Sequence, residues 1–110
     1  MDFKLLRDRA AVIRKQYENF ERASYGRAWT DEESALGFMG DVGDLMKLIQ
    51  AKNGVRGIPD VDKLLAHELA DCLWSILTLA DLYEIDLEGA FLSTMDELEQ
   101  HLSSKGNRKG

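Results

Sequence analysis

The sequence predicts an all-α protein with four helices, and three observations lead to this prediction. Helix-forming Leu, Ala, Glu, Lys and Arg dominate its 110 residues. The alternating β-branched runs that mark strands are missing, and Pro59 is the single proline. Apolar residues instead recur at spacings of three and four, as they do along one face of a helix. We therefore expect one domain, residues 1–110, built as a four-helix bundle-like subunit.

Capping signals set the expected helix boundaries. Thr30 and Glu33 form a capping-box pattern, in which each residue's side chain satisfies a backbone N–H of the other. Asp60 and Asp86 are suitable N-caps, because an aspartate side chain accepts hydrogen bonds from the first amides of a helix. Gly54 supplies the left-handed residue that closes many helices. The expected helices lie at about 2–23, 30–52, 60–83 and from 86 to a flexible polar tail at about 103–110.

Composition limits the classes of function. Fourteen basic and twenty acidic residues give a net charge of −6, which disfavours binding to nucleic acid or to an anionic membrane. The chain has no apolar stretch of membrane-spanning or signal-peptide length, and its single cysteine, Cys72, cannot form an internal disulfide. We therefore expect a cytoplasmic protein without nucleic-acid or membrane partners, which needs a cation to hold an anionic ligand.

Two pairs of acids at i, i+3 spacing lie among apolar neighbours. Asp41 and Asp44 belong to the second expected helix, and Glu68 and Asp71 belong to the third. This spacing places each pair on one helix face, and the short connection makes the two helices antiparallel neighbours. Four acids brought together repel one another unless a divalent ion lies between them. Mg²⁺ prefers such oxygen ligands and leaves positions open for water and phosphate oxygens, and Mn²⁺ is an alternative ion.

Another interpretation is that these acids are solvated residues of a purely structural interaction domain. The tryptophans are also open to two interpretations. Trp29 precedes the second helix, where its indole could stack on a base, whereas Trp74 extends an apolar run and favours packing. His67 points about 100° away from its neighbour Glu68, which favours a surface role. Gly40 and Gly43, beside the acids, indicate close helix approach, space for a ligand, or packing alone.

The acid pairs resemble the motifs of the MazG-type nucleoside triphosphate pyrophosphohydrolases, an all-α group that includes the dCTP pyrophosphatases. Residues 40–45, GDVGDL, are similar to the family's GEVGEL with both glutamates shortened to aspartate. Residues 68–71, ELAD, match the family's ExxD, and the similarity covers roughly residues 36–96. The resemblance implies Mg²⁺-dependent hydrolysis of a nucleoside triphosphate to monophosphate and pyrophosphate, as nucleotide house-cleaning, by a helical homodimer or dimer of dimers.

The resemblance also implies roles for individual residues. The implied metal ligands and catalytic residues are Asp41, Asp44, Glu68 and Asp71, and one carboxylate would orient or deprotonate the attacking water. The family's KMDxN motif corresponds to residues 94–99, TMDELE, which keep Asp96 as a substrate-binding candidate but lack the lysine and the asparagine. Phosphate contacts are then expected from other basic residues, namely Lys47, Lys52, Arg56, Lys105, Arg108 and Lys109. A catalytically weak or inactive module that binds nucleotide and metal is the alternative function.

Two further expectations concern the surface. The basic residues between positions 4 and 15, which include Arg14, are interpreted as a solvated face or a dimer salt-bridge surface. The third expected helix is apolar over more of its circumference than three partner helices of this length can cover. That extent predicts a buried dimer interface.

Overall fold

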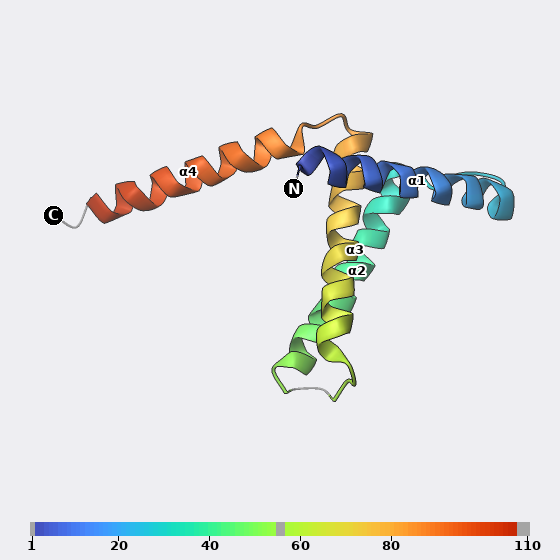
Figure 1. Cartoon of the computed structure of the whole chain (residues 1–110), viewed down its shortest axis with the longest axis horizontal. Coiled ribbons are helices and arrows are strands. Elements are labelled where there is room, and N and C mark those ends of the chain that lie inside the picture. The colour runs from blue at the N-terminus through green and yellow to red at the C-terminus, as the bar shows by residue number, and fades with distance from the viewer. Residues whose placement is uncertain (1, 55–56, 108–110) are drawn as a thin grey trace.

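The computed structural model describes residues 2–54 and 57–107, and in this part of the chain it consists of four α-helices without strands (Figure 1). The helices are α1 (Phe3–Tyr25), α2 (Asp31–Lys52), α3 (Val61–Leu82) and α4 (Leu87–Asn107). The predicted all-α class and the number of helices are confirmed.

Most of the predicted caps form. At the start of α2, Glu33 N donates to Thr30 Oγ1 (3.2 Å) and Thr30 N donates to Glu33 Oε1 (3.0 Å). At the start of α4, Gly89 N donates to Asp86 Oδ1 (3.2 Å). Asp60 is the exception, because it precedes α3 in a left-handed conformation (φ +56°) and its side chain accepts no capping bond. A capping side chain reaches the first amides from an extended backbone, which Asp60 lacks.

The C-terminal boundary also differs from the prediction. α4 continues to Asn107, so residues 103–107 are helical although the sequence predicts a flexible tail there. No proline interrupts this stretch, and the helix therefore continues through its serines. The remainder of the predicted tail, residues 108–110, lies outside the described residues.

The four helices are arranged as an antiparallel hairpin with two arms (Figure 1). α2 and α3 pack along each other, α1 crosses the end of this hairpin and contacts α3, and α4 projects away from the other three helices. The molecule measures 64 × 40 × 28 Å and has a radius of gyration of 18.1 Å. A compact domain of this length has a radius of gyration of about 13 Å. A single chain is therefore all-helical but elongated.

The hydrophobic core of the single chain is small. Among the described residues, the buried apolar side chains are Ala10, Leu48, Cys72 and Leu77, and no large side chain is completely buried. Large apolar residues are exposed on every helix, for example Leu69 on α3 and Phe91 on α4. The chain thus leaves much of its apolar surface uncovered.

Candidate active site

Three of the four predicted acids meet between α2 and α3. Asp41 and Asp44 of α2 and Glu68 of α3 each place a carboxylate oxygen within 4.8 Å of the other two, and we call these residues the carboxylate cluster. The i, i+3 spacing turns both aspartates toward α3, and antiparallel packing places Glu68 opposite them. Oxygens bound to one Mg²⁺ lie about 3–4 Å apart, so a small inward movement would suffice to hold an ion.

Asp71 lies at the side of this cluster, one turn beyond Glu68 on α3. Its carboxylate forms a second group with Glu68 and His67, whose ligand atoms also lie within 4.8 Å of one another. His67 Nε2 is 3.1 Å from Asp71 Oδ2. His67 is exposed, as its predicted surface role requires, but its imidazole contacts one of the predicted metal ligands. The i, i+4 spacing of His67 and Asp71 was the sequence signal for this pair.

Glu68 occupies the least favourable environment for a negative charge. Its Oε2 atom is buried and has no hydrogen-bond partner. Burial raises the pKa of Glu68, and the nearby charges of Asp71, Asp41 and Asp44 raise it further, while His67 acts in the opposite direction. A buried acceptor without a donor, surrounded by further carboxylates, is suited to binding a cation. The buried, unpartnered oxygen of Glu68 is thus a second indication of a cation site, in addition to the grouping of the acids.

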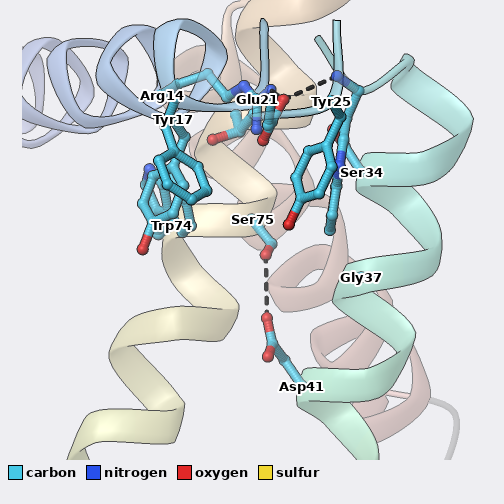
Figure 2. A pocket seen from close by; sticks show the side chains of 12 residues that line it. Arg14, Tyr17, Glu21, Tyr25, Ser34, Gly37, Asp41, Trp74 and Ser75 are labelled. Atoms are coloured by element: carbon cyan, nitrogen blue, oxygen red, sulfur yellow. Dashed lines mark hydrogen bonds and ion pairs between the residues drawn. The ribbon is translucent and has the colours of Figure 1, made fainter. Parts of the chain in front are cut away.

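A cavity of about 310 Å³ opens beside the cluster, between α1, the first half of α2, and α3 (Figure 2). Asp41 belongs to both the cluster and the cavity lining. In Figure 2, Asp41 lies below Ser75, whose hydroxyl donates a 3.4 Å hydrogen bond to Asp41 Oδ2. The cavity and the carboxylate cluster are therefore parts of one site.

Aromatic side chains form most of the cavity walls. Tyr17 and Trp74 lie together, with ring centroids 5.4 Å apart and planes tilted by 41°. Phe20 and Tyr25 make an edge-to-face contact with centroids 6.3 Å apart. Trp29, the predicted substrate-binding residue, also lines the cavity. We call this space the aromatic cavity.

Trp74 has the packing role that its apolar neighbours predict. It lines the aromatic cavity, and its Nε1 atom donates a 3.2 Å hydrogen bond to the carbonyl oxygen of Ala10 on α1. The indole therefore packs α3 against α1 while it presents one side to the cavity. Its position explains why an apolar run continues past the acids of α3.

The polar end of the cavity was not recognised in the sequence. Glu21 is only 4% exposed, and its Oε1 accepts hydrogen bonds from Arg14 Nη2 (2.7 Å) and from the backbone N of Trp29 (2.8 Å). Arg14 is therefore a partly buried ion-pair partner, which corrects its prediction as part of a solvated basic face. The i, i+7 spacing of Arg14 and Glu21, two turns along one face of α1, was the available signal. Thr78 Oγ1, also in the lining, is buried without a hydrogen-bond partner.

Two other predicted substrate-binding residues lie elsewhere. Lys47 is exposed on α2, one turn beyond Asp44, and does not line the aromatic cavity. Asp96 is on α4, which projects away from the hairpin, so a single chain does not bring it to the carboxylate cluster (Figure 1).

The other described basic residues predicted to contact phosphate also lie away from the carboxylate cluster. Lys52 makes an ion pair with Asp62 across the ends of α2 and α3, and Lys105 lies near the end of α4. Arg56, Arg108 and Lys109 lie outside the described residues. Within the described part of the chain, therefore, these basic residues do not form a patch beside the carboxylate cluster.

Comparisons of the chain with models of protein families, with curated proteins and with solved structures find no match. The resemblance to the MazG-type enzymes therefore rests on the sequence motifs and stays a prediction. None of the helices in residues 2–54 and 57–107 has the length and apolar content needed to cross a membrane.

Proposed function

We propose that this protein is a Mg²⁺-dependent hydrolase that converts nucleoside triphosphates to nucleoside monophosphates and pyrophosphate. The supporting observation is the carboxylate cluster, with its partnerless Glu68 oxygen, next to the aromatic cavity. Aromatic faces stack on nucleobases, and carboxylate-bound Mg²⁺ binds phosphate oxygens. The similarity of residues 40–45 and 68–71 to the MazG-type motifs supports the same reaction.

In this proposal the two parts of the site have separate tasks. Asp41, Asp44 and Glu68 would hold the ion, with Asp71 as a further ligand, and the bound ion would supply neutralising charge for the phosphate chain. The aromatic cavity would hold the base, with Asp41 at the junction of base and phosphates. Water attacks the α-phosphorus, the bond from this phosphorus to the bridging oxygen breaks, and pyrophosphate leaves. A carboxylate that is not fully engaged in binding the ion accepts the proton of the attacking water.

A catalytically weak or inactive module that binds nucleotide and metal is the second candidate. The shortage of positive charge around the site favours it, because Glu21 neutralises Arg14 and the described lysines with phosphate-binding potential lie away from the cluster. Phosphoryl transfer benefits from cationic groups that stabilise the developing charge. Without them, binding would persist while turnover falls.

The test is a panel of canonical and modified NTPs and dNTPs, incubated with the protein and Mg²⁺ or Mn²⁺ and analysed by chromatography. We expect equal amounts of monophosphate and pyrophosphate from at least one nucleotide. The products should disappear in Glu68→Gln and Asp71→Asn. Asp81→Asn is the matched control, because Asp81 is an exposed acid on the same helix outside the carboxylate cluster.

The negative outcomes separate the candidates. Metal-dependent nucleotide binding in a calorimeter, without product from any nucleotide, would favour the regulatory module. Absence of both binding and turnover would favour the interpretation in which the acids are solvated residues of a structural domain.

We also propose that the working unit is a homodimer or a dimer of dimers. The small core and the exposed apolar residues of the single chain support this assembly. Its mass in solution is independent of any activity and can be measured by light scattering.

A further inference from the structure

α4 is an amphipathic helix whose apolar face is largely exposed in the described part of the chain. Its large apolar residues recur every three or four positions and share one side of the helix: Leu87, Phe91, Met95, Leu98 and Leu102. Phe91 is 58% exposed and Leu98 is 51% exposed. In the described part of the chain, no side-chain hydrogen bond or ion pair joins α4 to another helix. We call this face the apolar stripe of α4.

The direction in which α4 leaves the hairpin is fixed. At the end of α3, Glu84 adopts a left-handed conformation (φ +54°), and Ile85 N donates a 2.8 Å hydrogen bond to the carbonyl oxygen of Ala80. This is the hydrogen-bond pattern of a capped helix end. The hydroxyl of Tyr83 also donates to Asp31 Oδ2 (2.8 Å), which ties this turn to α2. Reversal of α4 onto its own chain would require this bonded turn to rearrange.

An apolar groove of matching size lies between α1 and α3. It has a volume of about 380 Å³ and includes Leu6 and Ile13 of α1 and Leu73 and Leu77 of α3. Leu6 and Tyr17, at its two ends on α1, are eleven residues apart, which corresponds to about 17 Å of helix. Phe91 and Leu102 are also eleven residues apart, so the part of the stripe between them, without Leu87, has the same length of about 17 Å. We call this feature the α1–α3 groove.

The α1–α3 groove contains a basic side chain besides the acidic Asp71, and acidic side chains lie beside the apolar stripe. Arg9 lines the α1–α3 groove, and it belongs to no ion pair in the described residues. Glu88 and Glu99 lie at the same edge of the apolar stripe on the helical wheel, and neither forms an ion pair within the described residues. Complementary charges of this kind set the orientation in which two surfaces associate.

From these observations we propose that the apolar stripe of α4 docks into the α1–α3 groove of a second copy of this chain, with each copy donating its helix to the other. The inference deepens the proposed homodimer and does not depend on hydrolase activity. Reciprocal exchange is the closed, twofold arrangement of a domain-swapped dimer, and it buries two helix faces instead of one. Asp71 also lines the groove, so the docked helix would lie beside the fourth acid of the candidate site.

The experiment uses two full-length chains of different mass in a Cys72→Ala background, so that the engineered thiols are the only ones. One chain carries Leu98→Cys in the stripe, and the other carries Leu73→Cys in the groove. After mixing and treatment with a short bis-maleimide, we expect a product containing one chain of each mass. The matched control, Gln100→Cys, is on the opposite side of α4 and should give little of this product.

Three results would overturn the proposal. A monomer mass by light scattering at micromolar concentration would exclude the dimer itself. A crosslink that forms only within a single chain carrying both cysteines would show that α4 folds back on its own groove. A dimer without the mixed crosslink, or with equal crosslinking from Gln100→Cys, would place the interface elsewhere.

A variant provides an independent measurement. Leu98→Glu places a charge in the middle of the stripe, and we expect the dimer dissociation constant to rise by about a hundredfold or more. Helicity by circular dichroism should stay unchanged, because residue 98 is exposed in the single chain. An unchanged dissociation constant would contradict the docking of this face.

Discussion

The environment of Glu68 distinguishes a cation-binding site from a solvated acidic surface. Solvated acids keep their hydration, whereas Glu68 Oε2 is buried without a donor and is surrounded by Asp41, Asp44 and Asp71. Such a carboxylate destabilises the metal-free fold. Its retention in that position is explained if a cation occupies the cluster in the working protein.

The Glu68→Gln variant tests this explanation by stability alone. Removal of the charge relieves the repulsion, so the metal-free variant should unfold at a temperature a few degrees higher than the wild type, equivalent to ~1 kcal/mol. Mg²⁺ should raise the unfolding temperature of the wild type and leave that of the variant nearly unchanged. Calorimetric scans with EDTA or Mg²⁺ measure both effects. A wild type that is indifferent to Mg²⁺ would remove the metal site.

Glu33 gives a prediction about pH. Hydrogen bonding to Arg27, followed by the bond from the backbone of Thr30, lowers the pKa of Glu33 from its ordinary value of 4.5 to about 2. Because the folded-state pKa is the lower one, the ionised side chain stabilises the fold above pH 4.5, and this contribution disappears as the pH falls through about 2. The stability difference between wild type and Glu33→Gln should therefore shrink over this range. A difference that stays constant across the acid range would contradict it.

At the scale of single residues, the sequence predicted which acids lie together better than it predicted the contacts around the neighbouring cavity. The i, i+3 spacing was sufficient to bring Asp41, Asp44 and Glu68 together, because helix geometry and a short connection determine their placement. It was insufficient for Glu21. One of the two hydrogen-bond donors to Glu21 is the backbone amide of Trp29, which lies in a loop. The path of a loop has no periodic signal in the sequence.

At the scale of the helices, one side chain, Glu21, links the connection between α1 and α2 to α1. Glu21 of α1 holds the backbone of Trp29 and the guanidinium of Arg14, so it fixes both the loop and the wall of the aromatic cavity. If Trp29 stacks on a base, the accuracy of its placement depends on this buried carboxylate. Glu21 is thus a positioning residue in the proposed function.

We expect Glu21→Gln to be costly, because it leaves the partly buried Arg14 with only the longer, 3.7 Å contact to Glu18 as a counter-charge. Loss of one member of a buried ion pair destabilises proteins by about 3–5 kcal/mol, and the indole of Trp29 should become more mobile. Chemical denaturation measures the first effect, and the fluorescence of Trp29 in a Trp74→Phe background reports the second.

Glu18→Gln is the matched control for this prediction. Glu18 contacts the same arginine at 3.7 Å but is more exposed than Glu21, so its removal should cost less than ~1 kcal/mol. Equal losses from the two variants would show that burial of the Glu21 pair is not what stabilises the loop.

For the glycines of α2, the structure selects among the interpretations that the sequence left open. Gly40 and Gly43, beside the two aspartates, indicated close helix approach, space for a ligand, or packing alone. A Cβ atom built on Gly40 or Gly43 meets nothing within 4 Å among the described residues. Close approach within one chain is therefore wrong, and the glycines border open space beside the carboxylate cluster. The sequence pattern could not distinguish these cases, because it carries no information on which neighbour faces a helix position.

For the whole molecule, helix number and order were predictable, but the position of α4 was not. Capping signals and apolar periodicity are local, and they identify α4 together with its apolar face. They do not identify which surface covers that face. A radius of gyration of 18.1 Å and the small core are properties of the complete arrangement and have no local signature.

If two copies complete each other's core, thermal stability should depend on protein concentration. Unfolding of a dimer releases two chains, so dilution favours the unfolded state by mass action. We expect the unfolding midpoint to fall by about 3 °C for each tenfold dilution. Scanning calorimetry or circular dichroism over three decades of concentration measures this slope, and a midpoint that does not change on dilution would indicate a self-sufficient monomer.

The antiparallel hairpin also has a consequence for the order of events during folding. All four acids of the candidate site lie within residues 41–71, on two consecutive helices separated in the sequence by residues 53–60. Contacts between neighbouring segments close small loops and form rapidly, whereas docking between two chains waits for diffusion. The metal-binding face would therefore be assembled while each chain is still alone, and association would come afterwards.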